Sequence, residues 1–344
     1  VPIQNQKYSM KIIQVAKSIA RPIYFYSIQL YNRIVEKPHA KGFIFMLHRV
    51  ADWDDNNIIW NENMKVSPAK LDAILSEISR KYDVIRLEDV PSRLVSNHKR
   101  KFAVFTMDDG YKDNLTNALP VFKKHNLPYT IFLATDFMDG KAILWWYVIE
   151  DLILEYDEIV LSNGVTIRTK SKHEKEDAFL KIRSIILEQD QLNLLPALET
   201  LFSHYHIDWY AKCKKLALNW EDLQILKHEE LVTLGAHTQH HYNLKALPNS
   251  SDVIDEIKRG YSILEEKADL HPVVFAYPYG SIHEADKREF KVLSQMDDVF
   301  KLAVRACGGP VTEASSDLYS LPRIMLLEDY SCLTLLRYKN VCVI

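Results

Sequence analysis

Cysteine is scarce in this sequence. Only four of the 344 residues are cysteines, and no two of them stand in a C-x-x-C spacing. This scarcity excludes a zinc knuckle and a small scaffold held together by disulfides, and it favours a reducing compartment. The four are Cys213, Cys307, Cys332 and Cys342.

The sequence also has no excess of charge of one sign and no long hydrophobic run. There are 43 Lys and Arg against 46 Asp and Glu, a formal net charge of -3. We therefore expect no nucleic-acid partner, because such binding needs a broad basic surface. The most apolar stretch, residues 19–35, is interrupted by Arg21, Gln29, Asn32 and Arg33, so it falls short of the ~18 apolar residues of a membrane span. The 47% of hydrophobic residues can bury a large core, which excludes intrinsic disorder.

Residues 1–41 are expected to form a helical extension before the main domain. Residues 10–35 mix Lys and Arg with Ile, Val, Tyr and Phe. This composition fits an amphipathic helix packed on the protein, or a helix that rests on a membrane surface. A signal-peptide pattern is not seen, so we expect a cytoplasmic protein, at the inner membrane face if this helix binds lipid. Met10 is a candidate start, and the sequence leaves open whether residues 1–9 are native.

Residues 42–344 are predicted to form one α/β domain, because buried-strand and helix patterns alternate along them. Ser67-Pro68 is typical of a helix start, and helices are also expected over Asp252–Glu266 and Glu284–Met296. Continuous apolar runs predict strands over residues 42–47, 102–107 and 129–134. Later strands are expected over residues 232–236, 273–276, 301–304 and 318–324.

Residues 141–219 interrupt this alternation. They contain Asn163-Gly164 between two alternating runs, the strongest short signal for a β-hairpin. Helical patterns follow near residues 173–189 and 193–204. We interpret the segment as an insertion into the α/β domain that forms one wall of the active site.

Two adjacent acids follow one of the predicted strands. Asp108, Asp109 and Gly110 come directly after residues 102–107, and ligands of α/β folds bind at the carboxyl ends of strands. Two neighbouring carboxylates repel each other, so a cation is expected beside them unless one is protonated. The alternative is a simple turn in which the Asp side chains bond the local backbone.

Three histidines follow another predicted strand. His237 and His241 are four residues apart and would face the same way on a helical turn, but His237 and His240 are also close enough to share a metal. The alternative is a polar loop with surface histidines. Two histidines and one carboxylate are a common hydrolytic metal set, and a second carboxylate can then serve as general base.

These strings resemble the motifs of the polysaccharide deacetylases, the metal-dependent carbohydrate deacetylases with a NodB-homology domain. T-M-D-D-G at 106–110 resembles the motif T-F-D-D-G, and H-T-Q-H-H at 237–241 resembles H-[ST]-x-x-H. A-Y-P-Y at 276–279 resembles R-x-P-[YF], and M-L-H-R-V at 46–50 resembles an early Y-H-R-V segment. The second motif selects His237 and His241 as the ligands. The resemblance covers roughly residues 42–325.

The resemblance implies an irregular (β/α)7-type barrel whose motifs meet at one mouth. It implies that Asp108 is the general base and that Asp109, His237 and His241 bind a divalent metal, with Zn²⁺ the expected ion. It also implies that a backbone N–H near Tyr279 helps to hold the oxyanion.

Two family features are missing from this sequence. Ala276 stands where the third motif has its arginine, and we expect Arg323, on the last strand, to supply that charge. The alternative for Arg323 is a surface cation. The late histidine that donates a proton to the leaving amine is not visible, because no histidine follows His283. His48 is the candidate substitute, and a core or capping histidine is the alternative.

The resemblance implies a carbohydrate substrate. We expect the removal of an acetyl group from an N-acetylated sugar of a surface-polysaccharide or lipopolysaccharide precursor. The alternatives are O-deacetylation, hydrolysis of another amide, or a barrel that binds carbohydrate without turnover. Trp145 is a candidate for stacking on a sugar ring, or else for a helix core. The residues predicted to contact the substrate are Tyr111, Tyr277, Pro278 and Trp145.

Overall fold

The computed structural model describes residues 40–328 except 282, 307–308, 314 and 316. The predicted N-terminal helix and three of the cysteines therefore lie outside the described residues, and the domain boundary near residue 42 stays a prediction. No helix in the described part of the chain is long and apolar enough to cross a membrane.

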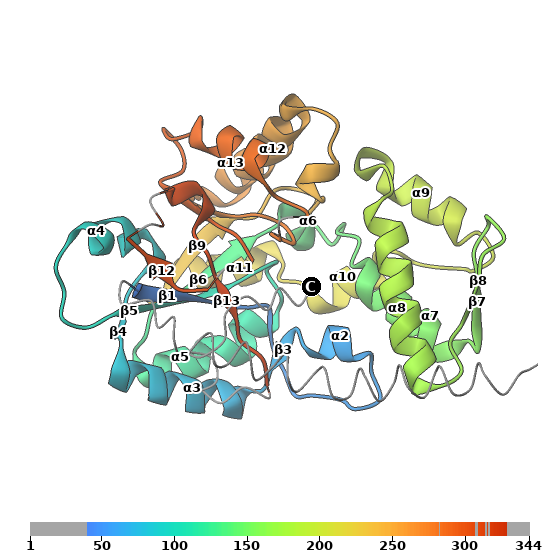
Figure 1. Ribbon diagram of the computed structural model, residues 1–344, viewed down its shortest axis with the longest axis horizontal. Helices are drawn as coiled ribbons and strands as arrows, with labels where there is room; N and C mark the ends of the chain where they lie inside the picture. The colour runs from blue at the N-terminus through green and yellow to red at the C-terminus, as the bar shows by residue number, and fades with distance from the viewer. Residues whose placement is uncertain (1–39, 282, 307–308, 314, 316, 329–344) are drawn as a thin grey trace, which may run out of the picture.

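A curled sheet with helices around it forms the body of the protein (Figure 1). Its strands run in the order β11-β10-β9-β6-β5-β1-β12, and β4 and β13 pair with β5 and β1. All pairings are parallel except that of β1 with β12. This architecture confirms the predicted irregular (β/α) barrel. The strands are β1 (Ala40–Leu47), β4 (Asp83–Val84), β5 (Phe102–Met107), β6 (Tyr129–Leu133), β9 (Val232–Ala236), β10 (Val274–Ala276), β11 (Leu302–Val304), β12 (Val311–Thr312) and β13 (Ile324–Met325).

Side chains alternate between the inside of the curled sheet and the layer of helices. Phe102 and Val104 of β5 belong to an inner apolar cluster, with Ile44, Phe132 and Val304 from neighbouring strands. The intervening residues of the same strands pack in the larger cluster beneath the helices. Because strand side chains alternate with a period of two, residue 108 comes next on the inner side after residues 102, 104 and 106.

The predicted strand over residues 318–324 is wrong. Residues Leu318–Ser320 form a 3₁₀ turn, which begins where the Asp317 side chain accepts a hydrogen bond from the Tyr319 N–H at 2.9 Å. Such a local turn competes with an extended strand. Leu321 still bridges to Val304 of β11, and Ile324 pairs with Phe45 of β1. The segment therefore crosses from β11 to β1.

Helices cover the outer face of the sheet. Ser67 caps α3 by accepting a hydrogen bond from Lys70, as its Ser-Pro start predicts. The helix predicted from residue 284 begins later, because Asp286 and Glu289 form a capping box at its start. The covering helices are α3 (Pro68–Lys81), α4 (Val90–Val95), α5 (Leu119–His125), α6 (Thr135–Met138), α11 (Trp220–Lys227), α12 (Ser250–Ala268) and α13 (Lys287–Ser294).

The insertion forms a helical lobe beside the sheet (Figure 1). The predicted hairpin is present, with Gly164 at φ 83° in its turn. The lobe has its own apolar core, which also includes Ile58 from the loop after β2. The elements of this region are β2 (Arg49–Val50), α2 (Ile59–Glu62), β3 (Lys65–Val66), α7 (Trp145–Glu155), β7 (Glu158–Val160), β8 (Thr166–Arg168), α8 (Lys172–Leu187), α9 (Leu194–Leu201) and α10 (Ala211–Leu216).

Candidate active site

Strained backbone marks the carboxyl ends of three strands of the sheet, β5, β9 and β10. Asp109 after β5, Thr238 and His241 after β9, and Tyr279 after β10 have φ of 76°, 71°, 61° and 58°. Residues other than glycine adopt such angles at a cost of ~1–3 kcal/mol each, and they cluster at functional sites. The turns aim the side chains of these loops at one point.

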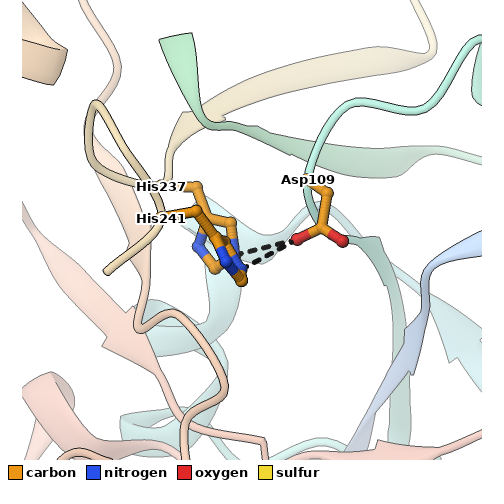
Figure 2. Close-up of side chains that lie close together, drawn as sticks. All are labelled: Asp109, His237 and His241. Carbon is orange, nitrogen blue, oxygen red and sulfur yellow. Dashed lines mark ion pairs between the residues drawn. The ribbon is translucent and has the colours of Figure 1, made fainter. Parts of the chain in front are cut away.

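Asp109, His237 and His241 converge at that point (Figure 2). Asp109 Oδ1 lies 3.3 Å from His237 Nε2 and 3.2 Å from His241 Nε2. All three side chains are buried, and their ligand atoms lie within 4.8 Å of one another. The helical turn considered for the histidines is wrong, because residues 237–241 form a loop. The positive φ at Thr238 and His241 brings the two rings together instead.

The surroundings of these side chains fit a metal ion. His237 Nδ1 lies 2.7 Å from the carbonyl oxygen of Ala276. A carbonyl can only accept, so Nδ1 carries the proton and Nε2 presents a lone pair to the site. Asp109 Oδ1 is buried and makes no hydrogen bond of acceptable geometry. Burial opposes ionisation of Asp109, but His241 and His237 hold its pKa well below the usual range. A buried carboxylate oxygen aimed at two imidazole nitrogens is a set that a divalent cation satisfies.

Asp108 forms a two-point ion pair with Arg323. The two guanidinium Nη atoms donate to Oδ1 at 2.6 Å and to Oδ2 at 2.7 Å. Arg323 is 1% exposed, and it also donates to Thr106 Oγ1 at 3.0 Å and to the Arg305 carbonyl at 3.1 Å. Burial would raise the pKa of Asp108, but the charge and hydrogen bonds of Arg323 outweigh burial and lower that pKa. Asp108 is therefore ionised at neutral pH.

His48 lies beside Asp108 at the end of β1. Its Nε2 is 4.0 Å from Asp108 Oδ2, and its buried Nδ1 has no hydrogen-bond partner among the described residues. Burial lowers the pKa of His48, against the opposing charges of Asp109 and Asp108. The imidazole is thus neutral at neutral pH in the metal-free protein.

His240 turns away from the triad and anchors its loop. His240 Nδ1 lies 2.7 Å from Oε2 of Glu256, and Oε1 of Glu256 accepts hydrogen bonds from the N–H groups of Gln239 and His240. Helix α12 approaches this loop closely, because a Cβ on Gly260 would lie 2.4 Å from the carbonyl carbon of Thr238. The histidine loop is therefore fixed by a carboxylate and a glycine of α12.

A pocket opens above the triad, and the insertion supplies one wall of it, as the sequence predicts. Trp145, Trp146, Phe179 and Arg183 line that wall, and His48, Asp108 and Asp109 lie in the pocket with His237, His241 and Tyr279. Trp145 donates from Nε1 to the Tyr279 hydroxyl at 3.1 Å, so the lobe is tied directly to the loop after β10.

Three residues predicted to contact the substrate are not among the described pocket-lining residues. Tyr111 is 1% exposed, and its hydroxyl accepts a hydrogen bond from Trp146. Tyr277 is fully buried and donates to the Tyr319 carbonyl at 2.8 Å. Pro278 is buried as well. Tyr111 therefore supports Trp146, which lines the pocket.

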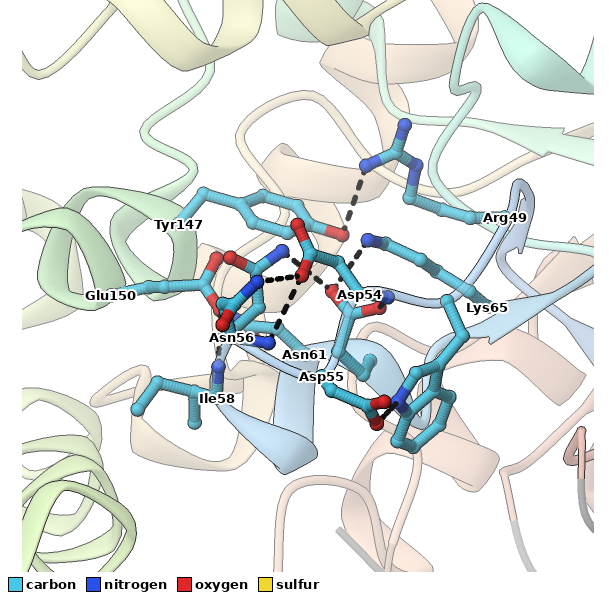
Figure 3. Close-up of polar contacts among 12 residues, drawn as sticks. Arg49, Asp54, Asp55, Asn56, Ile58, Asn61, Lys65, Tyr147 and Glu150 are labelled. Atoms are coloured by element: carbon cyan, nitrogen blue, oxygen red, sulfur yellow. Dashed lines mark hydrogen bonds and ion pairs between the residues drawn. The ribbon is translucent and has the colours of Figure 1, made fainter. Parts of the chain in front are cut away.

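A further wall, which the sequence did not predict, comes from the segment between β2 and β3 that contains α2. Trp60, Asn61, Asn63 and Met64 line the pocket. Figure 3 shows how polar side chains hold this segment: Glu150 of α7 accepts a hydrogen bond from the Ile58 N–H at 2.9 Å. Asn61 donates to the Trp146 carbonyl at 3.0 Å. Burial raises the pKa of Glu150. An acid in the otherwise apolar W-W-Y-V-I-E run at 145–150 is the one sequence signal for this contact.

Comparisons with known proteins agree with this architecture. The family model described as polysaccharide deacetylase matches residues 96–176 and 189–296, more than half of the chain. The Streptococcus pyogenes deacetylase PplD, solved in complex with acetate, superposes with a TM-score of 0.58 at 17% identity, over 88% of this chain and 99% of that chain. IcaB from Ammonifex degensii gives a TM-score of 0.53 at 15% identity, over 84% and 93% of the two chains. No curated protein matches the sequence. At these identities the solved structures show a shared fold.

Proposed function

Because this chain belongs to the polysaccharide deacetylase family, whose members are hydrolases of carbon–nitrogen bonds in carbohydrates, we propose that it removes the acetyl group from an N-acetylated sugar at the pocket above Asp109, His237 and His241. The observation that carries the proposal is the convergence of this triad beside the ionised Asp108. One group can bind a metal, and the other can accept a proton. The two lie at the same pocket.

Asp109, His237 and His241 would hold a divalent ion, Zn²⁺ in our proposal. When bound, such an ion polarises the acetyl carbonyl and lowers the pKa of a water molecule. The proton on His237 Nδ1, held by the Ala276 carbonyl, keeps Nε2 available as a ligand.

Asp108 is the proposed general base. Arg323 occupies one side of both carboxylate oxygens, but each oxygen keeps lone-pair capacity for a second partner. Asp108 takes the proton of the attacking water as the water oxygen bonds to the acetyl carbon. The lowered pKa of Asp108 keeps the carboxylate ionised and able to accept the proton. A lowered pKa also makes it a weaker base, so we attribute its contribution to the rate mainly to its fixed orientation.

Two further groups complete the proposed reaction. The Tyr279 N–H, on a loop with φ of 58°, donates to the oxyanion that develops on the carbonyl oxygen. His48 delivers a proton to the departing nitrogen as the C–N bond breaks. The products are acetate and the amino sugar. Because the His48 imidazole is neutral at rest, the proton that it delivers is the one that Asp108 received. Its Nε2 lies 4.0 Å from Asp108 Oδ2, so this transfer runs through a bridging water or after the two groups move closer.

The pocket walls support a carbohydrate substrate. Aromatic side chains of Trp60, Trp145, Trp146 and Phe179 surround the space above the triad, and aromatic faces suit the apolar face of a sugar ring. We propose that the sugar belongs to a precursor of a surface polysaccharide or lipopolysaccharide.

Acetate release from N-acetylglucosamine oligomers by the zinc-loaded protein tests this function, with Asp109→Asn as the inactive reference. We expect acetate from the wild type and none from the variant. Acetate from O-acetylated sugars alone would make the protein an esterase. Bound metal with no acetate from any acetylated sugar would make it a carbohydrate-binding barrel.

A further inference from the structure

Arg183 brings to the active-site pocket a positive charge that has a long ion pair but no hydrogen bond from its Nη2 atom among the described residues. It lies on α8 in the wall formed by the insertion, and its side chain is 17% exposed. Its Nη2 is buried and makes no hydrogen bond to any described residue. A buried donor without a partner costs ~1–3 kcal/mol, so the position needs a physical reason.

The acid nearest to this charge does not satisfy it. Glu284 Oε1 lies 3.9 Å from Arg183 Nη2, beyond the 2.7–3.2 Å of a hydrogen bond. The other oxygen of Glu284 already accepts a hydrogen bond from the Ser281 hydroxyl. By contrast, Asp108 is paired with Arg323 through two hydrogen bonds, and Asp109 belongs to the metal triad. Outside these groups, Arg183 is the charged side chain of the described pocket lining that is available to a ligand.

Arg183 is also close to the reacting groups. It is one turn from Phe179 on α8, and both line the pocket. Tyr279, from the loop after β10, lines the same pocket. The Tyr279 ring lies 4.8 Å from the His241 ring. A sugar seated over the triad would therefore have Arg183 at its side.

We propose that the substrate carries an anionic group, a carboxylate or a phosphate, on or next to the acetylated sugar, and that Arg183 binds it. The proposal rests on the proposed deacetylase function and names its substrate class. A guanidinium fork matches either group with two parallel hydrogen bonds. The carboxylate would come from a neighbouring uronic acid, and the phosphate from a glycosyl phosphate.

Calorimetric titration of the full-length, metal-loaded protein tests the proposal. The ligands are glucosamine, glucosamine 1-phosphate and a disaccharide of glucuronate and glucosamine, whose free amines prevent turnover. Arg183→Gln removes the charge from the pocket. Lys181→Gln is the matched control, because Lys181 is an exposed cation on the same helix and does not line the pocket.

We expect one of the two anionic sugars to bind wild type roughly ten- to hundredfold more tightly than glucosamine, the effect of a charge-assisted hydrogen bond. Arg183→Gln should abolish this preference, and Lys181→Gln should keep it. Whichever anionic sugar is preferred identifies carboxylate or phosphate as the group. Equal binding of all three sugars, or a preference that survives Arg183→Gln, would overturn the proposal.

Acetate release from the acetylated forms of the same sugars separates the two proposals. Equal release from neutral and anionic sugars, unchanged by Arg183→Gln, would refute the anion site and leave the deacetylase intact. A preference dependent on Arg183 in the titration, with no acetate from any sugar, would refute the deacetylase and leave the anion site.

Discussion

Arg323 and Asp108 are 215 residues apart in the sequence, and their side chains meet in a buried ion pair with both guanidinium Nη atoms on the carboxylate. In the family motif an arginine precedes the Tyr-Pro segment, where this chain has Ala276. Here the guanidinium comes from the segment that closes the sheet between Leu321 and Ile324. The charge beside the proposed base is thus present, and a different part of the chain supplies it.

Replacing Arg323 should impair the proposed base Asp108 while the protein still folds. Arg323→Lys keeps the charge but loses the two-point contact, so we expect a fall of roughly tenfold or more in kcat with the fold retained. Arg323→Ala should be worse, since removing one partner of a buried pair costs ~3–5 kcal/mol. Thermal unfolding and acetate release measure the two effects. Arg168→Ala, at an exposed arginine of the hairpin, is the control and should change neither.

The pH profile gives an independent test of this pair. Arg323 lowers the pKa of Asp108, and a base must be ionised to act, so Arg323→Ala should move the acid limb of the pH–rate profile to higher pH. The pair's contribution to stability is present above the unfolded pKa of Asp, ~3.9, and is lost as pH falls through the lowered folded pKa. The stability gap between wild type and Arg323→Ala should therefore narrow in strong acid. An unmoved acid limb would mean that Asp108 is not the titrating base.

Asp108 and Asp109 should respond differently to the same substitution. Asp108→Asn removes a proton acceptor and should lower the rate ~10²–10⁴-fold while the metal stays bound. Asp109→Asn removes a charged oxygen that faces both histidines, so it should lose the metal. Elemental analysis and acetate release on both variants distinguish the roles. Metal loss from Asp108→Asn, with metal retained by Asp109→Asn, would show that the two roles are exchanged.

The metal triad should bind about one divalent ion per chain. His237→Ala combined with His241→Ala should abolish binding, because only Asp109 would remain of the three ligands. His173→Ala is the matched control, since that side chain is 86% exposed on α8. Elemental analysis after zinc loading and gel filtration gives the stoichiometry. Full metal content in the double variant would place the ion elsewhere.

Much of the fold was predictable because its strands are continuous apolar runs. The strands over residues 102–107 and 232–236 have the bounds that the sequence predicts. β5 is buried along its whole length, and a run buried on both faces is visible without knowledge of its neighbours. These two strands carry Asp108, Asp109 and the histidine loop at their carboxyl ends. Only β6 lies between them in the parallel sheet, so the main site residues meet at one edge.

What the sequence could not predict depends on tertiary contact or on a local turn. In the 3₁₀ turn at 318–320 the Asp317 side chain accepts hydrogen bonds from the Tyr319 N–H and the Ser320 hydroxyl, and these favour the turn over an extended strand. Trp60 of α2 and Arg183 of α8 line the same pocket. No periodicity in either segment indicates this. The segment that carries Trp60 is held against α7 by the buried Glu150, which accepts a hydrogen bond from the Ile58 N–H.

The close approach of α12 to the histidine loop should make Gly260 irreplaceable. In an exposed helix, Gly→Ala usually stabilises by ~0.5–1 kcal/mol. At residue 260 the new Cβ would lie 2.4 Å from the Thr238 carbonyl carbon and 2.6 Å from its oxygen. Either the helix or the loop must shift, at a cost of ~1–3 kcal/mol typical of overpacking. Thr238 stands between the two metal-site histidines, so the shift should also weaken metal binding.

Urea unfolding and chelator competition measure these two consequences of Gly260→Ala. Ser262→Ala, at an exposed position of the same helix, is the matched control for helix propensity and should leave the unfolding midpoint and the metal affinity nearly unchanged. If α12 alone moves, stability falls and metal affinity holds. If the loop moves, both fall, which is the result we expect because Glu256 ties the loop to the same helix through the N–H groups of Gln239 and His240. A Gly260→Ala protein as stable as wild type, with unaltered metal affinity, would show that α12 does not position the histidines.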